Sequence, residues 1–152
     1  MDYRTNKRTG DKIRALGFGT AYICEAPEDE AVATIRKAFE GGVNYFDLAT
    51  SDKVTFSCFR KALGDVRDQV MYQIHFGADY SAGEYGWTTD GRAIRESVRN
   101  QLEELGTDYI DYGFIHCMDE EADWEYQPKL PAMWGEKRPK LHLPGRTGVL
   151  KG

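Results

Sequence analysis

The chain has 152 residues, of which 41% are hydrophobic, and this composition suits one domain that buries about two-thirds of its unfolded surface. A net charge of −5 offers no basic field for a nucleic-acid backbone, and no apolar run approaches the roughly 20 residues that span a bilayer. We therefore expect no nucleic-acid partner and no membrane partner. Three widely spaced cysteines (Cys24, Cys58 and Cys117) without a Cys-x-x-Cys pair favour a reducing, cytoplasmic location.

The first segments predict a β-hairpin, a short strand and a helix. Residues 3–14 alternate weakly around the turn sequence Arg-Thr-Gly-Asp at 8–11, which is typical of a hairpin. Residues 16–20, Leu-Gly-Phe-Gly-Thr, follow as a brief strand whose two glycines leave no side chain on one face. This favours close approach of another backbone or a ligand, and a merely tight strand is the alternative. Proline and acidic residues then open a helix over 27–39.

The most informative stretch is Gly-Gly-Val-Asn-Tyr-Phe-Asp-Leu-Ala at 41–49. The glycine pair is a helix stop, and Val-Asn-Tyr-Phe is a short β-prone run, so Asp47 lies just past a buried strand. In parallel α/β folds, the loops at the carboxyl ends of the strands face a common crevice where function collects. Asp47 is therefore the first candidate functional residue. The alternative is that it caps the next turn.

The following periodicity predicts a helix over 54–63, a strand over 69–76, a loop over 77–87, a helix over 91–105 and a strand over 109–116. This alternation argues for a parallel sheet with right-handed crossovers. His75 and His116 lie at the ends of the third and fourth strands, although a lone strand histidine is more often a hydrogen-bonded structural residue. The expected core comprises Phe18, Ile35, Phe39, Tyr45, Leu63, Met71, Ile94, Leu102, Tyr112 and Phe114.

The pattern changes after residue 118. An acidic start at 119–125 is followed by four of the five prolines and by a basic second part, so no helical or strand period persists. We therefore divide the chain into an α/β domain over 1–118 and a Pro-rich irregular tail over 119–152.

Three motifs in combination resemble the aldo-keto reductases. They are Leu-Gly-Phe-Gly-Thr at 16–20, Gly-Val-Asn-Tyr-Phe-Asp-Leu-Ala at 42–49, and Leu-Gly-Thr-Asp-Tyr-Ile-Asp at 105–111 followed by Ile115-His116. The resemblance runs through about residue 126 and is similar to the branch that often carries an iron–sulfur tail. It implies an α/β fold that forms the N-terminal half of a (β/α)8 TIM barrel, with about four parallel strands. Because a closed barrel needs eight strands, we expect a truncated family member.

The resemblance implies NADPH-dependent carbonyl reduction by an Asp, Tyr, Lys and His tetrad. Asp47 and His116 match the family's aspartate and histidine, whereas Asp52 and His75 stand at the positions of its tyrosine and lysine. An ionised Asp52 would repel the developing oxyanion, but a protonated Asp52 or either histidine could donate the proton instead. The candidate catalytic residues are therefore Asp47, Asp52, His75 and His116.

The resemblance also limits cofactor binding. Most family contacts to the NADPH phosphates come from the second half, so only Gly19, Thr20 and Asp47 could reach a nicotinamide here. The four clustered cysteines of an iron–sulfur tail are absent, and we expect no metal.

Two functions follow from these patterns. The first is an oxidoreductase for a small carbonyl substrate, weak or inactive as this chain alone and active when two halves close one barrel. The open sheet edges of such a half-barrel predict a homo-oligomer. The alternative is a non-catalytic binding module, or the remnant of a truncated reductase gene.

Overall fold

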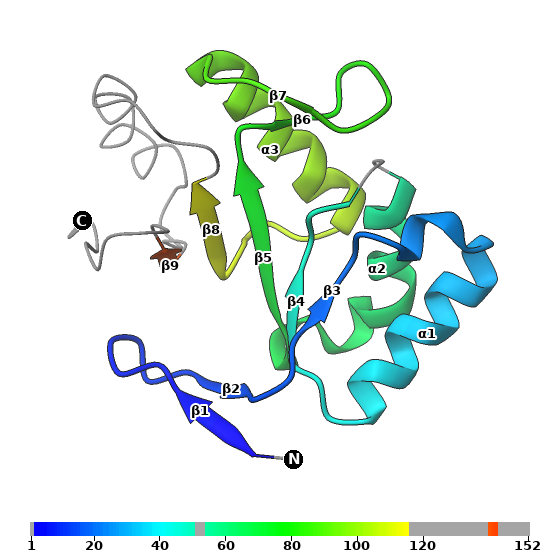
Figure 1. Ribbon diagram of the computed structural model, residues 1–152, viewed down its shortest axis with the longest axis vertical. Helices are drawn as coiled ribbons and strands as arrows, with labels where there is room; N and C mark the ends of the chain where they lie inside the picture. The colour runs from blue at the N-terminus through cyan, green and yellow to red at the C-terminus, as the bar shows by residue number, and fades with distance from the viewer. Residues whose placement is uncertain (1, 51–53, 116–139, 143–152) are drawn as a thin grey trace.

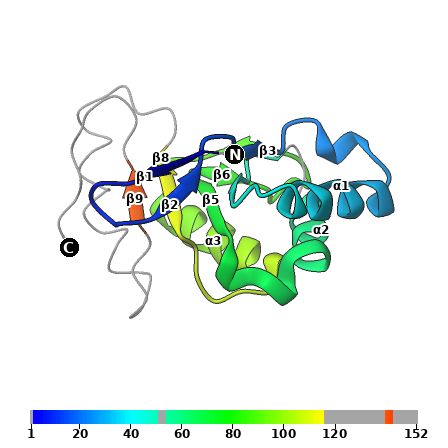
Figure 2. The ribbon, with the colours of Figure 1, turned by 90° about the horizontal axis from the view of Figure 1, so that it is seen from below.

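The computed structural model describes residues 2–50, 54–115 and 140–142 and contains a parallel sheet with helices on one face (Figures 1 and 2). A five-stranded parallel sheet has the spatial order β3 (Phe18–Gly19), β4 (Tyr45–Asp47), β5 (Met71–Phe76), β8 (Tyr112–Ile115) and β9 (Lys140–His142). The helices are α1 (Glu28–Glu40), α2 (Val54–Leu63) and α3 (Gly91–Leu105), joined by the short 3₁₀ segments η1 (Ile23–Glu25) and η2 (Gly64–Gln69). None of these helices, within the residues described, is long and apolar enough to cross a bilayer.

The expected hairpin, four strands and three helices are confirmed, and two further pieces of β-structure are present. The expected loop over 77–87 contains a small antiparallel ribbon of β6 (Ala78–Asp79) and β7 (Gly86–Trp87). In the tail, β9 pairs in parallel with β8, which would otherwise offer unpaired backbone groups along an open edge. Prolines at 139 and 144 flank this three-residue strand and hide it from any periodicity argument.

The core lies between the sheet and the helices. Phe46 is fully buried there, with its ring 5.8 Å from Phe18, 5.6 Å from Phe59 and 6.3 Å from Tyr72. None of the ten expected core residues is exposed: four are buried, and the other six are half-buried. Three of those six lie on the sheet face opposite the helices: Tyr45, Met71 and Phe114. Tyr45 pairs with Met71, and Phe114 pairs with His75.

The hairpin of β1 (Tyr3–Thr5) and β2 (Lys12–Arg14) docks at the amino-terminal end of the other sheet face. Tyr112 at the start of β8 is buried, and its hydroxyl donates to Asp11 Oδ2 at 2.5 Å and accepts from Asn6 Nδ2 at 3.2 Å. Asn44 just before β4 accepts from the Arg14 backbone N–H at 2.9 Å. These bonds anchor the hairpin near the strand starts and leave the carboxyl ends of the strands for a site.

Asp90 is the N-cap of α3, which spans the predicted residues 91–105. Its Oδ1 accepts backbone N–H groups of Ala93 at 2.8 Å and Arg92 at 3.0 Å, and Gly106 ends the helix at a φ of 64°. The hydrogen bond from Ala93, and then that from Arg92, stabilise the carboxylate and lower the pKa of Asp90 below its usual value.

Replacing Asp90 with alanine should therefore lower the melting temperature in a pH-dependent way. An aspartate whose pKa is lowered by folding stabilises the fold above its unfolded pKa of about 3.9, and this contribution disappears as pH falls through the folded pKa. Thermal unfolding followed by circular dichroism should show a larger difference at about pH 7 than at about pH 2, where the protonated carboxyl still caps the helix but has lost its charge. Asp90→Asn is the control, because it keeps the cap and lacks the charge. A difference independent of pH would contradict this account.

Candidate active site

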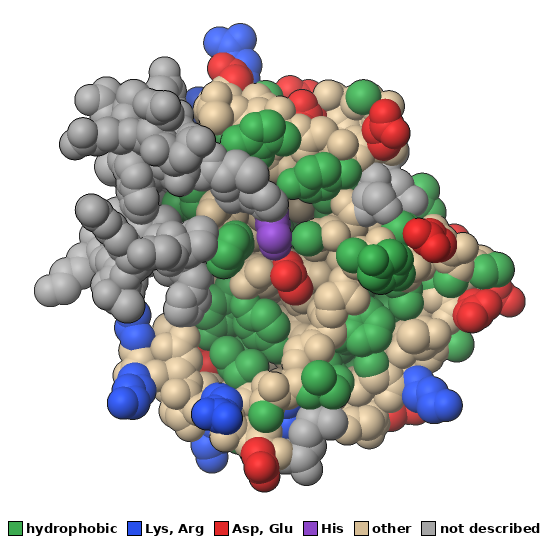
Figure 3. All heavy atoms as spheres, in the orientation of Figure 1, with side chains coloured by type: hydrophobic (Ala, Val, Ile, Leu, Met, Phe, Trp, Pro, Cys, Tyr) green, Lys and Arg blue, Asp and Glu red, His purple; other side chains and the backbone are tan. Residues whose placement is uncertain are grey.

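The sheet face opposite the helices carries the candidate site. Parallel pairing places Gly19 beside Asp47, Asp47 beside Gln73, and His75 beside Phe114. Because paired residues share a face, these side chains point to the same side of the sheet. Figure 3 shows hydrophobic side chains gathered on this face around a histidine and an acidic side chain.

Asp47 and His75 form a direct pair at the carboxyl ends of adjacent strands. His75 Nε2 lies 2.8 Å from Asp47 Oδ1, and the two side chains are 10% and 40% exposed, respectively. A carboxylate only accepts, so Nε2 carries the hydrogen of this bond. The imidazole also packs against Phe114, with the ring centroids 5.2 Å apart. The pair is thus an oriented imidazole with a carboxylate that reaches solvent.

Two neighbours fix the end of β4. The buried Thr20 donates its hydroxyl to the Asp47 carbonyl at 3.0 Å, and the Leu48 N–H donates to the Gln73 carbonyl at 2.9 Å. Thr20, which the family resemblance places near a nicotinamide, therefore uses its hydroxyl to support the backbone of Asp47. Gly19 differs, because a Cβ built at this position would meet nothing within 4 Å. Of the two glycines that favoured close approach of another backbone or a ligand, Gly17 lies near the Tyr45 backbone carbonyl, 3.5 Å from its built Cβ, and Gly19 leaves open space beside Asp47.

Sequence reasoning did not include Tyr45 and Gln73 in the site. The Tyr45 hydroxyl donates to Gln73 Oε1, and the Tyr45 ring lies 5.4 Å from that of Tyr112. Burial, with a smaller contribution from the Asp47 carboxylate, raises the pKa of Tyr45 well above its usual value, so its hydroxyl stays protonated. Two-residue alternation could have found both, since 45 precedes 47 on β4 and 73 precedes 75 on β5. Tyr45 and Gln73 lie next to the Asp47–His75 pair on the same sheet face, toward the amino-terminal ends of β4 and β5.

Of the four predicted catalytic residues, the structure brings Asp47 and His75 together. Asp52 and His116 lie outside the described residues. Within the described part of the chain, no three His, Cys, Asp or Glu side chains are grouped closely enough to hold a metal ion.

The described residues fit one end of NADPH. Gly19 leaves space and Asp47 offers a carboxylate, which suits the uncharged amide of a nicotinamide. Among the described residues that follow β3, β4 and β5 (20–26, 48–50 and 77–90) there is no lysine or arginine, and Lys53, which also follows β4, lies outside them. The described residues of these segments therefore offer a diphosphate no cation.

The sequence comparison decides the family. The model of the Aldo/keto reductase family matches residues 15–136, which is most of the chain. This chain belongs to the aldo-keto reductase family. It is 32% identical to L-galactose dehydrogenase of Arabidopsis thaliana over 98% of this chain and 49% of that protein. It is 28% identical to L-glyceraldehyde 3-phosphate reductase of Escherichia coli K12 over 82% of this chain and 39% of that enzyme.

Solved aldo-keto reductases have the same fold. The holo form of an enzyme from Bacillus halodurans superposes with a TM-score of 0.71 over 88% of this chain and 47% of that one. A Pseudomonas aeruginosa aldo-keto reductase gives 0.75 over 94% of this chain and 60% of its own, and both are 24% identical to this chain. The expected α/β fold, part of a TIM barrel, is confirmed.

The extent of these matches adds two facts. The chain spans about half or less of the curated relatives it matches. The family match passes the expected limit near residue 126 and continues into the tail, as far as 136.

Proposed function

We propose that this chain forms the Asp47–His75 side of an NADP-dependent carbonyl oxidoreductase site. The contact of 2.8 Å between His75 Nε2 and Asp47 Oδ1, at the carboxyl ends of adjacent parallel strands, carries this proposal. The names of the two relatives above, a dehydrogenase and a reductase, support an oxidoreductase that acts on a small carbonyl compound.

The chain's own residues handle the proton. Bound NADPH supplies a hydride to the carbonyl carbon. A protonated His75 gives a ring proton to the carbonyl oxygen, which completes the alcohol and leaves a neutral imidazole. Asp47 keeps that imidazole oriented and, being partly exposed, connects it to solvent for reprotonation. Thr20 positions Asp47 through its backbone carbonyl.

The family positions of Asp52 and His116 give them parallel roles in this proposal. His116 is the second candidate proton donor, and a protonated Asp52 is the third. Gly19 and Asp47 would hold the nicotinamide end of the cofactor.

We propose that this chain alone is weakly active, because most family contacts to the phosphates come from the second half of the barrel. A second half-barrel, from another copy or from a separate partner, would close the site through the edge at β3, the outermost strand of the described sheet at that side. The observation that favours a non-catalytic binding module instead is the replacement of the family's tyrosine and lysine by Asp52 and His75. We also propose a cytoplasmic location, because the three widely spaced cysteines favour a reducing compartment.

Titration of the purified chain with NADPH, followed by fluorescence, tests the proposal before any substrate is chosen. If a second copy closes the barrel, binding should strengthen with protein concentration, because association is then coupled to cofactor binding. Gly19→Ala should weaken it about tenfold, since the new methyl group occupies the space beside Asp47. Gly64→Ala is the matched control, because its Cβ also meets nothing within 4 Å but lies in η2, away from the site.

Absence of binding at every protein concentration would contradict the cofactor proposal. Carbonyl reduction then separates enzyme from binding module. The double variant Asp52→Tyr with His75→Lys restores the family's acid and its activator and should raise the rate of aldehyde reduction. If this variant neither binds NADPH nor reduces an aldehyde, the non-catalytic module is the better description.

A further inference from the structure

A pocket of about 530 Å³ lies along α3 on the helix side of the sheet. Its long wall is one side of α3 between Ala93 and Glu104, and its other walls are residues 79–81, from the last residue of β6 onward, and Phe56 in the first turn of α2. Figure 1 shows α3 running beside β6 and β7. The pocket is therefore separate from the Asp47–His75 face.

The lining of this pocket is strongly acidic. Four carboxylates line it, and no lysine or arginine does: Asp79, Glu96, Glu103 and Glu104. Asp79 accepts the Ser81 backbone N–H at 2.9 Å. No ion pair found among the described residues involves any of the four. The arginines of α3, at 92, 95 and 99, are absent from the lining. Carboxylates gathered in this way attract a cation.

Gln101 gives an independent sign of a missing hydrogen-bond donor. Ser97 Oγ donates its one hydrogen to the Ala78 carbonyl at 2.5 Å, so it can only accept from Gln101 Nε2, 3.1 Å away. This bond fixes the amide orientation. Gln101 Oε1 is buried and has no donor, and the residue, 2% exposed, lines the pocket. A buried acceptor without a donor is unfavourable, and a ligand that carries N–H groups would remove that cost.

Aromatic rings provide an apolar wall for the same ligand. The rings of Phe56 and Tyr80, which line the pocket, stand nearly perpendicular, with centroids 5.4 Å apart. Tyr85 is not part of the lining and packs on the Tyr80 ring, 5.9 Å away. The Tyr80 hydroxyl donates to the Thr50 carbonyl at 3.1 Å, which holds this ring in place. Aromatic faces bind both methylene groups and ammonium groups.

We propose that this pocket binds a linear alkyl polyamine. The carboxylates are spread along the helix, since Glu96 and Glu104 are separated by about 12 Å of helix axis at 1.5 Å per residue. No three of the described acidic, His or Cys side chains are grouped for a metal ion, so the charges suit a ligand with spaced positive groups. A polyamine donates hydrogen bonds without accepting any when fully protonated. Its methylene segments pack against Phe56 and Tyr80.

Isothermal titration calorimetry of the full chain with spermidine tests this site. We expect one spermidine to bind per chain and pentylamine, which has a single charge, to bind more weakly. The neutral diol 1,5-pentanediol should not bind. Glu96→Gln with Glu104→Gln should weaken spermidine binding about tenfold, because both charges leave the pocket. Gln101→Met should also weaken it, by removing the buried acceptor while keeping the side-chain volume.

The matched control is Glu25→Gln with Glu30→Gln, which removes the same charge from exposed positions outside the pocket. Spermidine should bind this variant as it binds the parent chain. Equal weakening in the two double variants would overturn the proposal, because it would indicate general attraction to an acidic protein. Absence of heat with the parent chain would also overturn it. Melting curves of all variants verify that they fold.

Discussion

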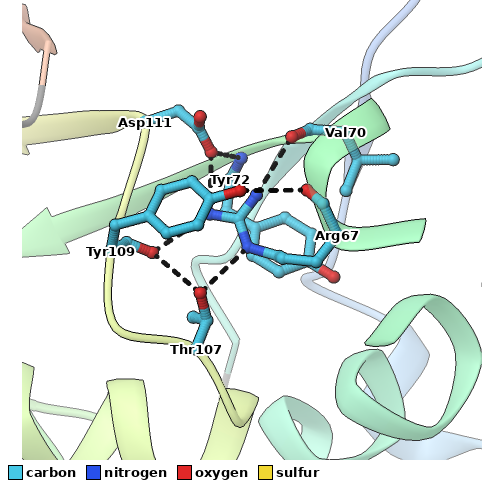
Figure 4. Close-up of polar contacts among 6 residues, drawn as sticks. All are labelled: Arg67, Val70, Tyr72, Thr107, Tyr109 and Asp111. Atoms are coloured by element: carbon cyan, nitrogen blue, oxygen red, sulfur yellow. Dashed lines mark hydrogen bonds and ion pairs between the residues drawn. The ribbon is translucent and has the colours of Figure 1, made fainter. Parts of the chain in front are cut away.

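Replacing Arg67 with alanine should lower the free energy of unfolding by about 3 kcal/mol, the low end for breaking a buried ion pair. The Arg67 guanidinium lies between two aromatic rings, 4.2 Å from the centroid of Tyr72 and 4.0 Å from that of Tyr109 (Figure 4). Its side chain is 12% exposed, and that of its ion-pair partner Asp111 is 16% exposed. The variant leaves that carboxylate without its cation and opens a gap between the rings.

The hydrogen bonds of Arg67 explain why its loss affects the whole sheet. Arg67 belongs to η2 and donates to the carbonyl of Val70, just before β5, at 3.0 Å. It also donates to the Tyr109 carbonyl at 3.0 Å and to Asp111 Oδ2 at 2.9 Å, both in the segment that leads into β8. The same Oδ2 accepts the Tyr72 N–H at 2.9 Å. One side chain thus joins the starts of two neighbouring strands.

Urea unfolding at one fixed protein concentration measures this effect. Arg67→Lys should recover only part of the stability, because an ammonium group lacks the planar fork that stacks and bonds at once. Arg99→Ala is the control: Arg99 is exposed on α3, and its loss should change stability by less than about 0.5 kcal/mol. If Arg67→Ala lowered the free energy of unfolding no more than Arg99→Ala does, the contacts of Arg67 with the starts of β5 and β8 would not contribute to stability.

Two simple rules, both readable in the sequence, explain why Asp47 and His75 meet. Both residues lie at the ends of short β-prone runs, and parallel strands bring such ends to one edge. Alternation then decides the face, and the pairing of Asp47 with Gln73 places His75, two residues later, on that face. The confirmed hairpin follows from its turn sequence at 8–11, and the helices and four strands follow from their periodicity.

Other features depend on contacts that no local pattern encodes. Arg67 lies in a 3₁₀ segment without a period, and its partners Tyr109 and Asp111 come more than 40 residues later. Gln101 and Ser97 look like polar surface positions of an amphipathic helix, yet both are buried beneath residues that follow β5. Burial of this kind follows from how the helix meets a loop, and only the tertiary structure shows it.

The second large effect is expected at Gly113 in β8. A Cβ built at this position would lie 2.1 Å from Cε2 and from Cζ of Phe76, which is far inside van der Waals contact. Phe76 is itself buried in the core on the helix side of the sheet, so its ring has little room to move. A glycine between Tyr112 and Phe114 looks like a weakness in a strand, but here it makes space for a neighbouring ring.

Gly113→Ala should therefore destabilise the fold by about 2 kcal/mol, within the usual range for overpacking a core. In a Phe76→Leu background the ring edge is gone, and the same substitution should cost little, which gives a coupling energy above about 1 kcal/mol in a double-mutant cycle. Gly19→Ala is the strand-glycine control, since its Cβ meets nothing within 4 Å and its stability should be unchanged. Urea unfolding of the four cycle members measures the coupling. Strictly additive costs would mean that Phe76 is not the residue that requires glycine at 113.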